Sequence, residues 1–247
     1  MNIIIPMAGP DDIMQKHGYP FCKPLIEIAN LPLIEHAWRS LAPLAPKKAV
    51  FVVRKEDDLR FHLADVLHLL EPRAVVVRAD GPTAGAACTT LLAIEQIEPD
   101  EELLIANGDQ VLHFPLQDAI QDFRDRSLDA GTVVFESLHP RWSFVRLDEN
   151  RMVVEAAEKR PLSKYATAGL YYFRRGEDFI RSTEAMIIKG ASVNGAYFVC
   201  PALNELVLVQ KRIGVYEIPR SKYVSLATPQ AIEEYEKSFL AVTRIGA

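Results

Sequence analysis

One aspartate in this sequence directly follows a buried-type apolar run, where a carboxylate could hold a metal ion. Residues 105–110 read IANGDQ, so Asp109 comes just after the apolar run through a short turn. Mg²⁺ keeps several of its waters and is usually held by one or two carboxylates together with phosphate oxygens. The pattern therefore favours a magnesium site at Asp109, and a plain turn carrying an exposed Asp is the alternative.

The N-terminal segment has the features of a phosphate-binding loop. The apolar run NIIIP at residues 2–6 is followed by Met7, Ala8 and Gly9, whose backbone N–H groups could face an anion. Lys23 follows in FCKPL, and a lysine can meet phosphate as a flexible point charge. A surface lysine beside a turn is the alternative for Lys23.

Two further segments are suited to contact a substrate. The sequence TAGAA at residues 83–87 contains small side chains that would let a planar base approach the backbone, and tight helix packing is the alternative. The pair Glu158-Lys159 sets a carboxylate, which can accept hydrogen bonds from sugar hydroxyls, beside an ammonium that can meet a phosphate. A solvated surface pair is the alternative there.

The first half of the chain alternates between buried strands and amphipathic helices, which would bring these segments together. Continuous apolar runs, typical of strands buried on both faces of a parallel sheet, occupy residues 2–6, 49–53, 74–77 and 103–106. Apolar residues at helical spacing occupy residues 33–44, 56–70 and 84–97. The alternation predicts a doubly wound α/β sheet that binds ligands at the carboxyl ends of its strands.

After about residue 131 the pattern changes to short strands with turns between them. Strands are expected at residues 132–135, 144–147, 152–156, 169–173 and 213–218, with a turn at 148–150. Helices are expected at residues 177–189, 202–209 and 229–239. We therefore predict a single α/β domain over 1–247, with a nucleotide-binding half at about 1–130 and an acceptor-binding half at about 131–247.

Composition excludes several classes of protein. The 247 residues carry a net charge of -5 with 25% charged residues and no Lys/Arg run, which argues against a nucleic-acid partner. No apolar run approaches the roughly 18 residues of a membrane span, and the N-terminus lacks the basic start of a signal peptide. Cys22, Cys88 and Cys200 lie far apart and are expected to be reduced thiols of a cytoplasmic protein.

Taken together, these segments resemble the sugar-phosphate nucleotidyltransferase family, and are most similar to a bacterial branch associated with capsule and surface polysaccharide. The resemblance rests on IIIPMAG, KPLIEI, TAGAACTTLLA, LLIANGDQ, VVEAAEKRPLS and ATAGLYYFRRGEDF. It implies a Rossmann-like fold of the GT-A type, with a mixed, mostly parallel central sheet flanked by helices. It also implies Mg²⁺-dependent transfer of a nucleoside monophosphate from a nucleoside triphosphate to a sugar 1-phosphate or small phosphorylated metabolite, with pyrophosphate release.

The resemblance assigns roles to individual residues. Lys23, Asp109 and Lys159 match catalytic positions, and Asp109 is also the metal ligand. The positions expected to bind nucleotide are Ala8, Gly9, Thr83, Ala84, Gly85, Asn107 and Gly108. The positions expected to bind the acceptor are Glu158, Lys159, Gly169 and Asn194. Family members are often oligomeric, so a homo-oligomer is a further expectation.

The signature loop of the family is altered in this sequence. Its pattern G-x-G-x-R falls on residues 9–13, where Asp11 replaces the second glycine and Ile13 replaces the arginine. Asp12 adds a further negative charge, which would oppose a triphosphate by about 1–4 kcal/mol for a contact at ~4 Å. Ser225 stands where many members have a second metal-binding Asp, and Ala227 stands where glycine is usual.

Three functions remain open at this point. The first is an active nucleotidyltransferase with an altered loop, and the second is a binding or regulatory homologue that keeps the pocket without efficient catalysis. The third is a glycosyltransferase that uses a ready-made nucleotide sugar, although the usual Asp-x-Asp motif is absent around Asp109. Restoring Gly-Ser-Arg at residues 11–13 separates the first from the second, because it would raise turnover greatly only if the loop has lost its function.

Overall fold

The computed structural model describes residues 1–10 and 12–245, with the backbone alone described for residues 242–245. The prediction made for Asp11 therefore falls outside the described residues. None of the helices within these ranges is both long and apolar enough to cross a membrane.

The first half of the chain builds a parallel sheet, as its apolar runs predicted. The central strand β1 (Asn2–Pro6) pairs in parallel with β4 (Lys48–Arg54) and with β6 (Leu103–Ala106). Strand β5 (Val75–Ala79) adds in parallel to the outer side of β4. Because all four strands point the same way, their carboxyl ends meet at one edge of the sheet.

The second half continues the same sheet with antiparallel strands. Strand β11 (Tyr165–Phe173) runs antiparallel to β6 and also pairs with β8 (Ala130–Glu136) and β9 (Ser143–Leu147). Strand β10 (Val153–Glu158) pairs with β9, and β12 (Ile213–Glu217) runs parallel to β8. Among the described residues nine strands form this sheet, so the predicted mixed α/β sheet is confirmed.

Helices cover both faces of the sheet. Residues that alternate along β1 point to opposite faces, so Ile3 and Ile5 pack in one buried cluster and Ile4 in another. The helices that contribute to the first cluster are α2 (Leu33–Leu41), α4 (Leu63–Leu70) and α6 (Leu116–Asp125). Those that contribute to the second are α5 (Ala86–Leu91), α7 (Gly176–Ile188) and α8 (Val199–Leu208).

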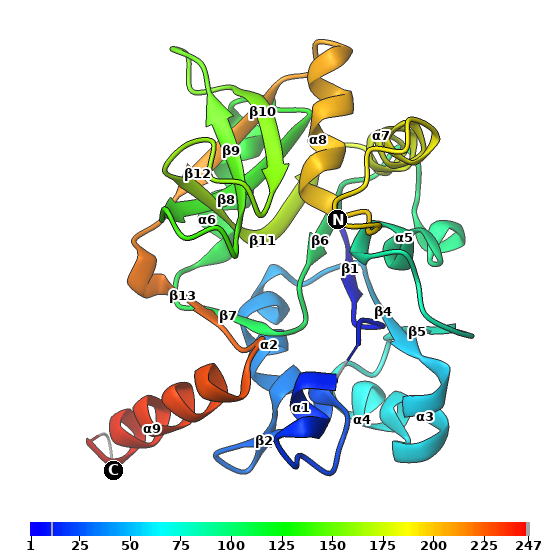
Figure 1. The fold of residues 1–247 in the computed structure, drawn as a ribbon, viewed down its shortest axis with the longest axis vertical. Coiled ribbons are helices and arrows are strands. Elements are labelled where there is room, and N and C mark those ends of the chain that lie inside the picture. Colours follow the sequence, from blue (N-terminus) through cyan, green and yellow to red (C-terminus); the bar gives the residue numbers. More distant parts are fainter. Residues whose placement is uncertain (11, 246–247) are drawn as a thin grey trace.

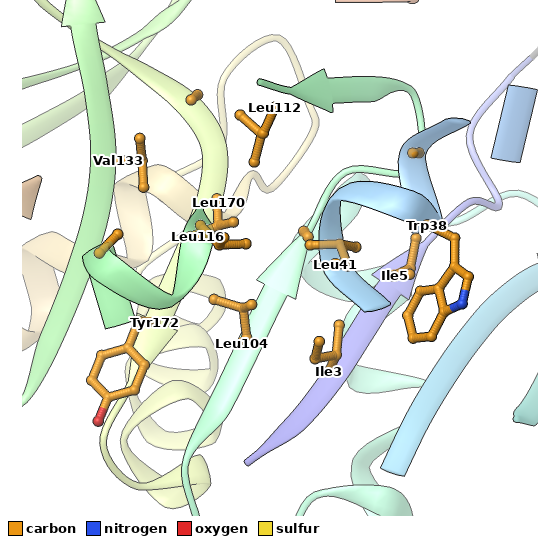
Figure 2. Packing of buried hydrophobic residues seen from close by; sticks show 14 of the residues in the cluster. Ile3, Ile5, Trp38, Leu41, Leu104, Leu112, Leu116, Val133, Leu170 and Tyr172 are labelled. Carbon is orange, nitrogen blue, oxygen red and sulfur yellow. The ribbon is translucent and has the colours of Figure 1, made fainter. Parts of the chain in front are cut away.

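The first cluster holds the two halves of the molecule together. Figure 2 shows Ile3 of β1 and Leu104 of β6 near Leu41 of α2, with Leu170 of β11 and Leu116 of α6 beside them. These side chains are almost fully buried. Each buried Leu or Ile stabilises the fold by about 1.5–3 kcal/mol relative to an exposed side chain. The cluster therefore holds β1, β6 and β11 firmly together.

Several short elements and a long helix complete the fold. The short elements are α1 (Asp12–Lys16), β2 (Glu27–Ile28), β3 (Leu31–Pro32), α3 (Lys55–Phe61), β7 (Gln110–Leu112) and β13 (Tyr223–Ser225), and the long helix is α9 (Pro229–Ile245). Strand β13 pairs antiparallel with β7, which returns the end of the chain to the turn after β6. In Figure 1, α9 projects from one side, while β8 to β10 and α8 gather at the opposite end from α1 to α4.

The structure corrects some of the predicted boundaries. The helix expected at residues 56–70 is broken into α3 and α4 by His62, whose φ of 54° is left-handed. The helix expected at 33–44 ends at Leu41 and continues as a 3-10 turn that contains Pro43, which has no N–H to donate. The helix expected at 84–97 is limited to α5 and a 3-10 turn, and α6 was not predicted at all.

Candidate functional site

A cavity of about 960 Å³ opens at the carboxyl edge of the parallel strands. The residues that end or follow the four strands, Pro6, Arg54, Ala79 and Asn107, all line it. The sequence-predicted residues that line it are Ala8, Gly9, Lys23, Thr83, Gly85, Asn107, Gly108, Asp109, Glu158 and Gly169. The cavity therefore joins segments from both halves of the chain.

Lys23 and Asp109 form an ion pair on the cavity wall. The Nζ atom of Lys23 donates to Oδ2 of Asp109 over 3.0 Å, and their side chains are 25% and 23% exposed. Lys23 opens a 3-10 turn that Pro24 stiffens, while Asp109 follows β6 and its carbonyl oxygen accepts a hydrogen bond from the N–H of Leu226. The two residues, 86 positions apart in the sequence, thus place one positive and one negative charge together at the end of β6.

The loop after β1 approaches the cavity through its backbone. Ala8 is buried, whereas Gly9 and Pro10 are exposed, and all three line the cavity. Ile13, at the position where the family pattern has an arginine, belongs to α1, is 55% exposed and does not line the cavity. The described part of this loop consequently brings backbone groups to the cavity and no basic side chain.

The small-residue segment after β5 is fixed to a hairpin of the second half. The N–H of Tyr197 donates to the carbonyl oxygen of Ala84 over 2.7 Å, and the N–H of Ala87 donates to the carbonyl oxygen of Tyr197 over 3.0 Å. Gly85 lies between them with a φ of 106°, and a Cβ there would approach the Tyr197 oxygen to 2.4 Å. Glycine is required at this point because the two backbones are in direct contact.

Gly169 connects strand β11 to the turn that follows β6. Its carbonyl oxygen accepts hydrogen bonds from the N–H of Asn107 at 3.1 Å and from Nε2 of Gln110 at 3.2 Å. Its φ is 60°, and a Cβ would lie 2.2 Å from Nδ2 of Asn107. Strand β11 of the acceptor half is thereby attached to the turn that carries Asp109.

Glu158 ends β10 and faces a set of neutral polar groups. The Ser143 hydroxyl donates to its carboxylate, and burial raises the pKa of Glu158 above its ordinary value. Thr167 and Tyr171 share a hydrogen bond of 2.9 Å next to it on the cavity wall, and Cys200 lies there as well. Burial also raises the pKa of the Cys200 thiol, so that thiol stays protonated at neutral pH.

Three sequence-predicted residues do not line the cavity. Ala84 contributes its carbonyl oxygen to the contact with Tyr197. Lys159 is exposed, with its Nζ atom 5.4 Å from the ring of Phe198, which does line the cavity. Asn194 is exposed in the turn between Val193 and Ala196. Their substrate contacts stay predictions.

Several cavity residues were not identified from the sequence. Arg54 ends β4 and pairs with Asp57 at 2.7 Å, and its place directly after a buried strand was a usable signal. Arg141 and Tyr223 reach the cavity from a loop and from a three-residue strand, and neither segment has a comparable sequence pattern. Trp142 is half-buried and also lines the cavity.

The residues at the end of β6 fit a magnesium ion that is completed by phosphate. Asp109 supplies one carboxylate. Ser225 also lines the cavity, and it pairs across β7 and β13 with Gln110, the residue that follows Asp109. Within the described part of the chain no group of three or more His, Cys, Asp or Glu is suited to hold a metal. An ion at Asp109 would therefore depend on substrate oxygens, which is the way Mg²⁺ is commonly held.

Comparisons with known proteins agree with this architecture. The sequence profile of the family described as nucleotidyl transferase matches residues 19–184. A nucleoside-diphosphate-sugar pyrophosphorylase from Vibrio cholerae RC9 superposes with a TM-score of 0.84 at 24% identity, over 96% of this chain and 100% of that chain.

Two further solved structures share the fold. A putative glucose-1-phosphate thymidylyltransferase from Bacillus anthracis has a TM-score of 0.74 at 18% identity, over 96% of this chain and 93% of that one. An inositol-1-phosphate CTP transferase from T. maritima has a TM-score of 0.74 at 16% identity, over 93% and 90%. At these identities the structures establish the Rossmann-like fold and leave the substrates of the present chain to its own residues.

Proposed function

The chain belongs to the nucleotidyl transferase family, and we propose that it transfers a nucleoside monophosphate from a nucleoside triphosphate to a sugar 1-phosphate or small phosphorylated metabolite. The observation that carries this proposal is that one cavity is lined by both the Lys23–Asp109 pair and Glu158. We call the wall around the pair the donor end and the wall around Glu158 the acceptor end. A cavity of about 960 Å³ has room for both substrates.

The reaction needs no nucleophile from the protein. An oxygen of the acceptor phosphate attacks the α-phosphorus of the triphosphate, the bond from that phosphorus to the bridging oxygen breaks, and pyrophosphate leaves with the electron pair. Catalysis then consists of alignment and of neutralising phosphate charge. Both tasks suit a rigid cavity wall at the carboxyl ends of four parallel strands.

At the donor end, we assign charge neutralisation to Lys23 and Asp109. Lys23 would donate to phosphate oxygens, exchanging its contact with the carboxylate for contacts with the substrate. Asp109 would hold Mg²⁺ together with phosphate oxygens, and the ion would neutralise charge on those oxygens. The backbone of Ala8, Gly9, Asn107 and Gly108 would bind the nucleotide, and the turn at Thr83 and Gly85 would receive the base.

At the acceptor end, Glu158 would accept hydrogen bonds from acceptor hydroxyl groups. Its carboxylate is already oriented by the Ser143 hydroxyl, and Gly169 lines the cavity between Glu158 and Asn107. Lys159 follows directly in the chain and remains the proposed partner of the acceptor phosphate, and Asn194 remains a proposed acceptor contact. We propose that the protein works in the cytoplasm as a homo-oligomer and that it synthesises precursors of surface polysaccharide.

A binding or regulatory role is the second candidate function, and a specific observation favours it. Among the described residues that line the cavity, the carboxylates of Glu56, Asp80, Asp109 and Glu158 outnumber the cations of Lys23, Arg54 and Arg141. Such a lining is poorly matched to a triphosphate with four negative charges. On this alternative the chain binds a nucleotide or sugar phosphate and turns it over slowly.

Calorimetry combined with a pyrophosphate-release assay tests both functions. Wild-type protein is titrated with UTP, CTP, dTTP, ATP and GTP in the presence of Mg²⁺, beside the triple variant Asp11→Gly, Asp12→Ser, Ile13→Arg. Micromolar binding of one nucleotide and pyrophosphate release with a sugar 1-phosphate support the enzyme. Binding without turnover in the wild type, with turnover recovered in the triple variant, supports the second candidate.

A further inference from the structure

Arg141 brings a positive charge to the cavity that the sequence did not reveal. It lies in the loop between β8 and β9, is exposed, and lines the cavity next to Trp142 and Ser143. Its guanidinium carbon is 4.3 Å from the centre of the Trp142 ring. No Asp or Glu among the described residues forms an ion pair with it.

The loop holds Arg141 in place through its own backbone. The N–H of Arg141 donates to Nδ1 of His139 at 3.2 Å, and the N–H of His139 donates to the Ser137 hydroxyl at 3.2 Å. The carbonyl oxygen of Trp142 accepts a hydrogen bond of 3.0 Å from the N–H of Lys159. The loop is thereby attached to the end of β10, directly beside Glu158.

The ring beneath Arg141 is fixed as well. Trp142 packs edge-on against Phe135 at 5.4 Å and against Tyr223 at 5.5 Å. A second guanidinium, that of Arg220, lies 5.7 Å from the Trp142 ring. Two arginines therefore flank one aromatic group, and the positive potential they create is suited to an anion.

The other cavity cations differ from Arg141 in this respect. Lys23 pairs with Asp109, and Arg54 pairs with Asp57 and Glu56. Within the described part of the cavity lining, Arg141 is consequently the cation whose charge is not offset by a carboxylate. Its guanidinium lies over the Trp142 ring, and an aromatic ring accepts none of its N–H groups in plane, so these N–H groups remain for an oxygen acceptor.

We propose that Arg141 is a phosphate-binding residue of this cavity. The inference rests on the proposed function for the identity of the ligands, whose shared chemistry is a phosphate group. That group belongs either to the acceptor or to the nucleotide. A guanidinium binds phosphate through two parallel N–H bonds, so the contact also orients the group.

Binding measurements on Arg141→Gln test the proposal without relying on turnover. The matched control is Arg146→Gln, because Arg146 is an exposed arginine of the strand β9 that follows the loop, pairs with Glu155 and does not line the cavity. Ligands are used in pairs that differ in phosphate, namely glucose 1-phosphate and glucose, and each triphosphate and its nucleoside, with inorganic phosphate added. Circular dichroism of both variants checks that they are folded.

The tryptophans provide a second readout. The chain has two, and Trp38 is buried in the core, so the variant Trp38→Phe leaves Trp142 as the reporter. Engagement of the Arg141 guanidinium by a phosphate is expected to change the Trp142 emission. The phosphate-free member of each pair is expected to change it less.

The expected result is a loss of about tenfold to hundredfold in affinity for the phosphate-bearing ligand in Arg141→Gln, with a change under about twofold for its phosphate-free partner. A loss confined to the sugar phosphate assigns Arg141 to the acceptor, and a loss confined to the nucleotide assigns it to the donor. Equal affinities of Arg141→Gln and Arg146→Gln for the phosphate-bearing ligands overturn the proposal. A wild-type protein that binds no phosphate ligand overturns it as well. Failure of the proposed function is seen separately, as phosphate binding that depends on Arg141 without pyrophosphate release.

Discussion

Asp109 and Glu158 are two carboxylates on one cavity, and their surroundings differ. Asp109 lies 3.0 Å from the ammonium of Lys23. Glu158 instead accepts a hydrogen bond from the Ser143 hydroxyl, and burial raises its pKa. The donor end thus pairs its carboxylate directly with an ammonium, whereas the Glu158 carboxylate contacts a hydroxyl, and the charge of the neighbouring Lys159 lowers its pKa less than burial raises it.

This difference indicates what each end can bind. On a partly exposed wall, the Lys23 ammonium can exchange its contact with the carboxylate for contacts with phosphate oxygens. A buried carboxylate beside neutral groups gains most from a neutral donor such as a sugar hydroxyl.

Removing either member of the donor pair is expected to have the largest effect. Lys23→Met and Asp109→Asn should each lower the rate of pyrophosphate release by about 10²–10³-fold, because charge that develops on phosphate loses a fixed partner. The measurement is steady-state turnover at saturating Mg²⁺. Lys47→Met is the control, as Lys47 is exposed, pairs with Glu101 and does not line the cavity. Retention of activity within about threefold in both donor variants would contradict the assignment of the donor end.

Gly169→Ala tests the connection between the two ends. A Cβ at this φ of 60° would lie 2.2 Å from Asn107 and 2.7 Å from Gln110, so we expect a loss of about 2–4 kcal/mol in the free energy of unfolding. That loss corresponds to a decrease in Tm of roughly 5–10 °C. Gly81→Ala is the control, because nothing lies within 4 Å of its added Cβ. Similar Tm values for the two variants would mean that the connection is not rigid.

Arg220→Gln tests the aromatic wall that both ends share. The Arg220 guanidinium lies 5.0 Å from Phe135, 5.7 Å from Trp142 and 5.5 Å from Tyr223, so its loss should cost about 1–2 kcal/mol. Thermal denaturation should show a decrease in Tm of roughly 2–6 °C. The exposed Arg212, replaced in the same way, should leave Tm nearly unchanged. An unchanged Tm in Arg220→Gln would show that the rings hold their positions without the cation.

Glu158→Gln should have a small effect on thermal stability, and the size of the change in Tm should depend on pH. Because burial raises the folded-state pKa of Glu158 above 4.5, the protonated form stabilises the fold below pH 4.5, and this contribution is lost as pH rises through the folded-state pKa. The neutral amide should therefore increase Tm by about 2 °C at pH 8 and leave it unchanged at pH 4.

A neighbour on the same strand provides the control for this pH dependence. Glu155 pairs with Arg146 and Arg160, so Glu155→Gln should decrease Tm slightly at pH 8, opposite to Glu158→Gln. Thermal scans at both pH values decide the matter. A Tm difference for Glu158→Gln that is equal at pH 4 and pH 8 would contradict a buried carboxylate at the acceptor end.

Much of the fold could be predicted because its buried strands have an unambiguous pattern. The runs at Asn2–Pro6 and Leu103–Ala106 match β1 and β6 residue for residue. Helix α6 was not predicted, although its buried residues Leu116, Ala119, Ile120 and Phe123 have the spacing of an amphipathic helix. Strands of two or three residues such as β7 and β13 depend on their partners, and short segments carry no period of their own.

The site was predictable where a residue sits directly at a strand end. Asp109 and Glu158 follow or close buried strands, and both line the cavity. Lys159 shows the limit of that reasoning, since its φ of 53° turns the chain immediately after Glu158 and the residue is exposed. Arg141 was not found because its position depends on the packing of Trp142 against Phe135 and against Tyr223, and Tyr223 is distant in sequence.

The backbone contact between Tyr197 and the segment at Ala84 and Ala87 has a kinetic consequence. Its hydrogen bonds of 2.7 and 3.0 Å join the turn proposed to receive the base to the hairpin of the acceptor half. A nucleotide that orders this turn would order the hairpin at the same time, so the acceptor would then meet a completed pocket. We expect compulsory-order addition, nucleotide first, and slower amide exchange at Tyr197 once the nucleotide is bound.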